Sequence, residues 1–253
     1  TSVSDLWGIG RRYAKQLHEK WSIYDGWQLA QVSDSFANKY LGGVVGTRLV
    51  RELRGISSRM MEEERVQKKM IATTRMFGRR VYELSEIKEA IATYTARAAE
   101  KLRRQFSAAG HIHVFIIEHR EGERHGMAYD NNRHLDKPTS DSSVLIRIAI
   151  ELVTSIYKKG PAYKKAGVIL SDIVPEAARQ GSLFVDSASA DDDRLPLMLA
   201  IDNINFSSPP AHEPQHDTIL RFAAAGTNRG WKMKQDYRSP RYTTKWHEMP
   251  AVR

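Results

Sequence analysis

An alternation of strand and helix patterns over residues 71–175 constrains the fold more than any other feature of this chain. Four strand patterns enclose two amphipathic helix patterns in the order strand-helix-strand-strand-helix-strand. The order predicts an α+β fold, in which a four-stranded sheet carries both helices on one face and leaves the other face open. Ser85 is expected to cap the first helix, and Ser140 or Asp141 the second. The apolar helix faces are predicted to comprise Ile87, Ile91, Tyr94, Ala98 and Leu102, then Leu145, Ile148, Leu152 and Ile156.

The first of these strands, Thr73–Val81, carries three arginines. Alternation places Arg75 and Arg79 on one side, together with Thr73 and Phe77, and Arg80 on the other. A cluster of cations on a helix-free sheet face favours a nucleic-acid backbone as partner over a solvated face without one. The predicted DNA-binding residues in this part of the chain are Thr73, Arg75, Phe77, Arg79, Arg80, Lys164 and Lys165.

A Gly-Ile-Gly turn lies in the all-helical pattern of residues 1–55. Two glycines allow a tight turn with close backbone approach, and the helix that follows presents free N–H groups and a positive dipole end to an anion. The simpler interpretation is a plain glycine turn between helices, because a lone Gly-x-Gly is weak evidence. The residues predicted to bind DNA here are Gly8, Ile9, Gly10, Arg11 and Arg12.

Composition agrees with an anionic partner. The net charge is +9, and a basic balance of this size favours a nucleic acid, although a merely soluble basic protein would look the same. Cysteine is absent, which excludes disulfides and thiolate chemistry and suits a reducing cytoplasm. No apolar run approaches the roughly 20 residues that a membrane helix needs, so we expect no membrane contact.

The remaining segments are predicted to connect the domains and to recruit a partner protein. We interpret residues 56–70 as a tether and residues 176–195 as a linker. In the linker, Gln180-Gly181-Ser182-Leu183-Phe184 places two large apolar side chains in polar surroundings, which favours docking in a partner's groove. The tail, residues 196–253, interleaves aromatic and basic residues that could stack on bases, form a small domain or pack on a partner protein.

One string suggests a different class of protein. His212-Glu213-Pro214-Gln215-His216 matches the zinc-hydrolase pattern His-Glu-x-x-His, which requires both histidines one turn apart on a helix. Pro214 and the prolines just before the string argue against that helix. We keep a metal-dependent hydrolase as a hypothesis that zinc analysis would test. His111 and His113 are interpreted as sheet-surface residues rather than ligands.

Taken together, these motifs resemble the C-terminal part of the UmuC group of Y-family translesion DNA polymerases, the catalytic subunit of DNA polymerase V. Leu6–Arg12 and Thr47–Gly55 are similar to the thumb, and Arg75–Val81 to the first strand of the little finger. Gln180–Phe184 resembles the sliding-clamp-binding pentapeptide, and Ser239–Trp246 the C-terminal signature of the group. The resemblance covers nearly the whole chain.

The resemblance implies a thumb-like helix-hairpin-helix domain at 1–55, a little finger at 71–175 and an irregular tail at 196–253. It implies primer–template DNA, the sliding clamp (through Gln180, Leu183 and Phe184), a processed UmuD dimer and RecA as partners in SOS mutagenesis. It also implies a cytoplasmic, nucleoid-associated bacterial location. The palm carboxylates that hold magnesium in the family have no counterpart here, so this chain is expected to bind no cofactor and not to polymerise DNA alone. The alternative is a non-catalytic DNA-binding adaptor that docks on the clamp.

Overall fold

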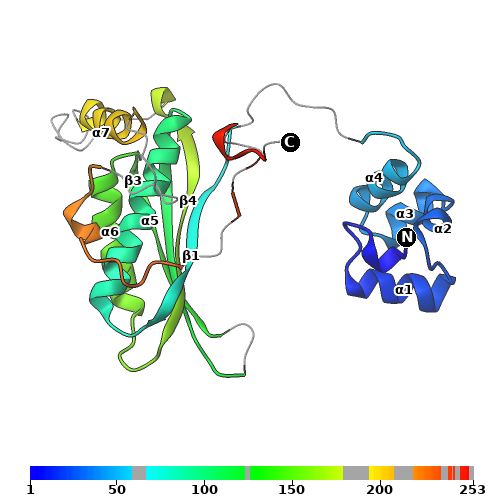
Figure 1. Cartoon of the computed structure of the whole chain (residues 1–253). Coiled ribbons are helices and arrows are strands. Elements are labelled where there is room, and N and C mark those ends of the chain that lie inside the picture. Colours follow the sequence, from blue (N-terminus) through cyan, green and yellow to red (C-terminus); the bar gives the residue numbers. More distant parts are fainter. Residues whose placement is uncertain are drawn as a thin grey trace. The chain divides into compact units, whose positions relative to one another are not determined.

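The chain divides into two compact units, Thr1–Val66 and Gln67–Arg253, which we describe separately (Figure 1). The computed structural model describes residues 1–58, 67–122, 126–178, 194–207, 219–234, 239–240, 242 and 246–250. Among these residues, no helix combines the length and the apolar character that crossing a bilayer requires.

The first unit is helical. Its core contains Val3, Leu17, Leu29 and Val50, all fully buried. The unit consists of η1 (Val3–Asp5), α1 (Arg11–Trp21), α2 (Gly26–Ala30), α3 (Asp34–Tyr40) and α4 (Val44–Leu53).

Asp34 ties α3 to α4. Its carboxylate accepts hydrogen bonds from Arg51 Nε at 2.8 Å and Arg54 Nη1 at 3.0 Å. The bond from Arg51 is the largest of the causes that lower the pKa of Asp34. The two arginines therefore fix the end of the unit, where the sequence is similar to the end of the thumb.

The second unit contains the predicted α+β fold. Its sheet is antiparallel, with strand order β1-β4-β2-β3, so β1 and β3 are the edge strands and β4 is an inner strand. Both long helices lie on one face of the sheet (Figure 1), as the strand-helix order predicts. The elements are β1 (Ile71–Val81), α5 (Leu84–Arg104), β2 (Ser107–Glu118), β3 (Ala128–Thr139), α6 (Ser142–Ile156) and β4 (Tyr163–Pro175).

The core between sheet and helices follows the predicted periodicity. In β2, Ile112, Val114 and Ile116 are fully buried, and the residues between them lie on the open face. Every residue predicted for the apolar face of α5 is buried. Asp141 caps α6 by accepting from the Ser143 N–H at 2.6 Å, as predicted. The Ser85 cap is wrong, because α5 begins at Leu84 and its N-cap residue is Glu83.

The C-terminal part of the chain also lies against this unit. After η2 (Glu176–Ala178), the described elements are α7 (Leu195–Ser207), η4 (Ala223–Ala225) and η5 (Trp246–Glu248). Ala225 packs against Ala92 of α5 and Ile146 of α6. In Figure 1 the orange segment that follows η4 runs past the helices towards β1. The predicted tail therefore packs against the helices of the α+β fold.

Candidate nucleic-acid interface

The Gly-Ile-Gly turn of the first unit leads directly into α1. Gly8 has φ +100°, a backbone conformation that favours glycine, and Ile9 anchors the turn in the core. Gly10 is the N-cap residue of α1, and a Cβ at Gly10 would meet no atom within 4 Å. The turn is thus open to the outside at the residue from which the helix begins.

Arg11 and Arg12 are the first residues of α1, and both side chains are exposed. Ala14 is the first residue of the helix whose N–H has a backbone acceptor, the Gly10 carbonyl at 3.0 Å. Among the described residues, the preceding helical N–H groups have no backbone acceptor, which is usual for a helix start. Exposed positive charge and N–H groups without a backbone acceptor therefore occur at the same helix start, as a phosphate contact requires.

Two of the residues predicted for DNA contact in β1 belong to the core. Thr73 is 6% exposed and Phe77 is 8% exposed. Thr73 is paired with Val168, and Phe77 packs in the cluster that contains Val81 and Tyr94. Their side chains face the helices, so we remove both from the predicted interface.

Arg75 and Arg79 do not line the open sheet face, and that expectation is wrong for these two arginines. Arg75 is paired with Ala166, whose side chain is in the core, so Arg75 projects on the helix side, where it is exposed at the sheet edge. Arg79 forms an ion pair with Glu86 of α5. Arg80 pairs with Glu121 at 3.3 Å. The cations therefore follow the edge of the sheet, because β1 is an edge strand.

The predicted lysines of β4 lie next to β1. β4 is an inner strand, and Lys165 is paired with Met76 of β1 and Ile117 of β2. Lys165 Nζ lies 5.8 Å from the centre of the Phe115 ring, on the open face. Lys164 lies where the strand register shifts, close to Gly126, which precedes β3. Of the predicted β4 cations, Lys165 is therefore the one that the sheet brings to the open face.

A cation cluster that the sequence reading missed adjoins Arg75. It consists of Lys68, Arg75, Arg97 and Lys101, from the chain before β1, from β1 and from α5. Lys68 and Arg75 are exposed, and Arg97 and Lys101 are half-buried. Within the described part of the chain, none of the four has an ion-pair partner. Lys101 Nζ lies 3.5 Å from Thr73 Oγ1, so the cluster is anchored to β1.

The electrostatics of Lys101 reflect this crowding. Burial is the largest cause that lowers the pKa of Lys101, followed by repulsion from Arg97 and Lys68, with a smaller repulsion from Arg75. Glu100 opposes the change in pKa. Like charges held together disfavour the charged form, and an anion placed among them would relieve that cost. The cluster is thus a candidate site for a phosphate group.

The open face itself is polar rather than basic. His111 and His134 face each other with ring centres 4.4 Å apart, and His113 Nε2 lies 3.1 Å from Asp130 Oδ2. His111 also contacts Ser171 Oγ at 2.8 Å through Nδ1. The two predicted sheet-surface histidines therefore lie on the sheet surface. Within the described ranges, no group of three or more metal-ligating side chains could hold a metal ion.

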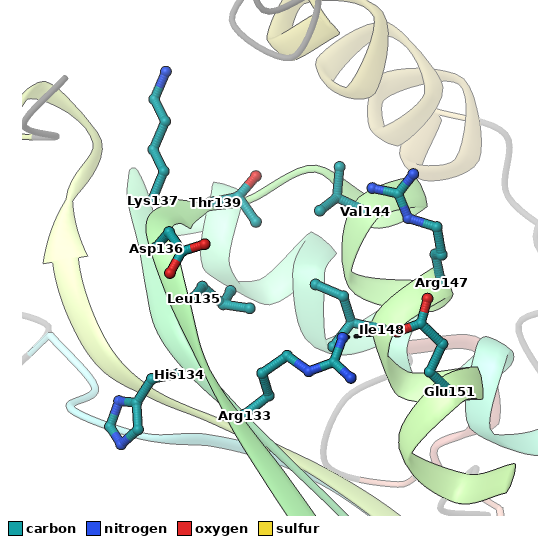
Figure 2. Close-up of a pocket in the computed structure, with 10 residues that line it drawn as sticks. All are labelled: Arg133, His134, Leu135, Asp136, Lys137, Thr139, Val144, Arg147, Ile148 and Glu151. Carbon is teal, nitrogen blue, oxygen red and sulfur yellow. Dashed lines mark hydrogen bonds and ion pairs between the residues drawn. The ribbon is translucent and has the colours of Figure 1, made fainter. Parts of the chain in front are cut away.

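A pocket of about 530 Å³ lies between β3 and α6, beside the opposite edge strand (Figure 2). Leu135, Val144 and Ile148 form its apolar part. Arg133 and Glu151 are joined by an ion pair of 2.7 Å, and Arg147 is exposed nearby. None of the predicted DNA-binding residues lines this pocket, so it is separate from the β1 edge.

Several sequence predictions fall outside the described residues. These are the clamp peptide with Gln180, Leu183 and Phe184, and the His212, Glu213 and His216 string. Each stays a prediction.

An antiparallel sheet with strand order β1-β4-β2-β3 and two helices on one face defines an α+β domain of the βαββαβ type. Its sequence has known relatives. Residues 68–183 match the impB/mucB/samB family C-terminal domain, and residues 196–252 match a domain of unknown function (DUF4113).

One relative is similar to nearly the whole chain, and others to a large part of it. Protein UmuC of Salmonella typhimurium is 33% identical over 99% of this chain and 57% of its own length. DNA polymerase IV of Streptococcus thermophilus is 25% identical over 70% of this chain and 46% of its own length. A solved insertion ternary complex of Dbh DNA polymerase matches 69% of this chain and 48% of its own, at 15% identity and a TM-score of 0.37.

Residues 68–183 therefore form an impB/mucB/samB family C-terminal domain, and nearly the whole chain is similar to part of the UmuC, SamB and MucB proteins. This confirms the resemblance to the UmuC group. The chain spans little more than half the length of the UmuC relative.

Proposed function

We propose that this chain holds primer–template DNA for a translesion polymerase of the Y family. The observation that carries the proposal is the cation cluster of Lys68, Arg75, Arg97 and Lys101 at the β1 edge. Folding brings these charges together although repulsion among them is unfavourable, and a DNA phosphate is the anion that would compensate for it. Two relatives that carry the name of a polymerase or of UmuC support the same proposal.

Contacts of this kind position a protein on DNA without reading its sequence. In this proposal, the cluster contacts DNA phosphates, and so does the Arg11–Arg12 helix start. The magnesium-dependent transfer chemistry belongs to palm residues outside this chain, which itself binds no cofactor. The proposed role of this chain is therefore to bind and position DNA during DNA repair by translesion synthesis.

The salt dependence of DNA binding tests the proposal. Affinity of the full chain for a fluorescent primer–template should fall steeply as salt rises, with a log–log slope of about −0.9 for each phosphate neutralised. Fluorescence anisotropy between about 50 and 200 mM salt measures the slope. Unrelated sequences should give the same affinity within a few-fold, because phosphate contacts carry no sequence information. An affinity that does not change with salt would contradict the proposal.

We also propose that Gln180, Leu183 and Phe184 dock on the sliding clamp, as the resemblance implies. Replacing Leu183 and Phe184 by alanine removes both apolar anchors, so clamp binding should be lost, with a fall in affinity of at least about tenfold. DNA affinity should stay unchanged, since neither residue is cationic. Surface plasmon resonance on immobilised clamp measures the clamp affinity. An unchanged clamp affinity would refute the role proposed for the peptide.

Processed UmuD and RecA remain proposed partners, which co-purification with each would test.

A further inference from the structure

The region that matches a domain of unknown function contributes a side chain to the core of the second unit. Trp231 is 2% exposed. Its ring meets Phe77 of β1 edge to face at 6.4 Å and Tyr94 of α5 at 5.8 Å. Its indole Nε1 donates to Glu89 Oε2 at 3.4 Å. An aromatic side chain so enclosed belongs to the core as fully as the strand residues that it touches.

The same segment closes the edge of β1. The Gly78 N–H donates to the Trp231 carbonyl at 2.9 Å, so an edge amide that would otherwise face outward is paired. The Lys232 carbonyl oxygen occupies the place where a side chain at position 78 would begin. Glycine is therefore required at this position of β1. Unpaired strand edges are sites of unwanted pairing, and at Gly78 this edge is covered.

A second anchor lies at the other end of the segment. Asp202 of α7 binds the guanidinium of Arg103 with both oxygens, at 2.6 Å to Nε and 2.8 Å to Nη2. Arg103 is 4% exposed and also donates to Ser142 Oγ at 3.0 Å. Between the anchors, Ala225 packs between α5 and α6. The segment is thus bound to both helices and to β1.

We propose that residues 194–207 and 219–234, which we call the strap, are a fixed part of the DNA-holding unit that closes the β1 edge and adds Lys234 to it. The backbone N of Lys234 lies 3.2 Å from the position of a Cβ on Gly78, and its side chain is exposed. Arg79 and Arg80 follow Gly78 in the strand. The closure stands on packing alone, whereas the role of Lys234 rests on the proposed DNA function.

Substitutions from both sides of the contact test the closure. Gly78→Ala pushes the strap away without leaving a cavity, and Trp231→Ala removes the anchor. Each should raise hydrogen exchange at the backbone amide of position 78 at least about tenfold and lower the Tm of the second unit, by about 5–10 °C for Trp231→Ala. Trp231→Phe, which keeps a ring, should restore most of the protection.

Matched controls separate strap loss from general damage. At Gly230 a Cβ would make ordinary contacts, the nearest at 3.6 Å to Arg79, and Trp246 is 85% exposed. Gly230→Ala and Trp246→Ala should change neither the hydrogen exchange at position 78 nor the Tm of the second unit. Unchanged exchange at Gly78 in both Gly78→Ala and Trp231→Ala would overturn the strap. If Trp231→Ala fails to fold, Gly78→Ala decides the matter.

Lys234→Gln tests the functional part in the full chain with the primer–template probe. Affinity should fall about three- to tenfold and the salt slope should become shallower by about 0.9, as for one phosphate contact. The effect should shrink in a Gly78→Ala background, where the strap is displaced. If Arg75→Gln lowers affinity and Lys234→Gln does not, Lys234 is wrongly assigned and the DNA proposal stands. If neither substitution lowers the DNA affinity, the assignment of Lys234 and the DNA proposal both fail.

Discussion

Replacing Asp202 by alanine is expected to lower the free energy of unfolding of the second unit by about 3–5 kcal/mol. The substitution leaves the Arg103 guanidinium, whose side chain is 2% exposed, without its carboxylate. A buried charge that loses its partner keeps the cost of desolvation and loses the compensating attraction. The hydrogen bonds from Arg103 to Ser140 and Ser142 remain, but both acceptors are neutral. Urea denaturation of the full chain measures the loss.

Two further variants identify the cause of the loss. Glu100→Ala breaks a partly exposed i,i+4 pair with Arg104 on the same helix and should cost no more than about 1 kcal/mol. The double substitution Arg103→Met with Asp202→Leu removes both charges and should recover most of the stability that Asp202→Ala loses. A loss below about 1 kcal/mol for Asp202→Ala would show that α7 contributes little to the unit.

The alternating core of the second unit could be predicted because burial alone determines it. Ile112, Val114 and Ile116 face the helices, and Asp141 caps α6, as the local sequence indicates. Strand order could not be predicted in this way. β4 is the last strand in the chain and an inner strand of the sheet, since it pairs with both β1 and β2. That placement depends on how the whole sheet assembles.

The site was harder to predict for a related reason. Arg97 and Lys101 show the i,i+4 spacing of one helix face, but nothing local indicates that Arg75 of β1 and Lys68 face them. Trp231 lies among lysines in the sequence, and an aromatic residue in such surroundings can either stack on a base or pack in a core. The structure buries it. Such contacts join residues far apart in sequence, and periodicity within one element cannot reveal them.

Removing the charges of Lys101 and Arg75 is expected to cost the largest share of DNA affinity. In Lys101→Met with Arg75→Gln, two phosphate contacts disappear, so affinity for primer–template DNA at about 0.1 M salt should fall by about 10- to 100-fold. The salt slope should become shallower by about 1.8. Uniform weakening across unrelated sequences is expected, since both contacts are made to the backbone.

The same double variant should be more stable than the unsubstituted chain, although it binds DNA more weakly. Because the pKa of Lys101 is lower in the folded chain than its ordinary value of 10.5, the folded state holds this proton less tightly than the unfolded state. Stability from this group therefore rises as pH increases through the folded pKa towards 10.5, and a cost remains at neutral pH. Methionine removes that cost, so the Tm should rise by about 1–3 °C. A variant that had simply unfolded would lose stability and DNA affinity together.

The most direct test of a DNA-holding β1 edge compares this double variant with Arg147→Gln in one anisotropy titration on the same primer–template. Arg147 is an exposed cation on α6, beside the opposite edge strand β3 (Figure 2). We predict that the double variant loses about 10- to 100-fold in affinity while Arg147→Gln changes it less than about threefold. Equal losses in the two proteins, or no loss in either, would contradict a DNA-holding role for the β1 edge.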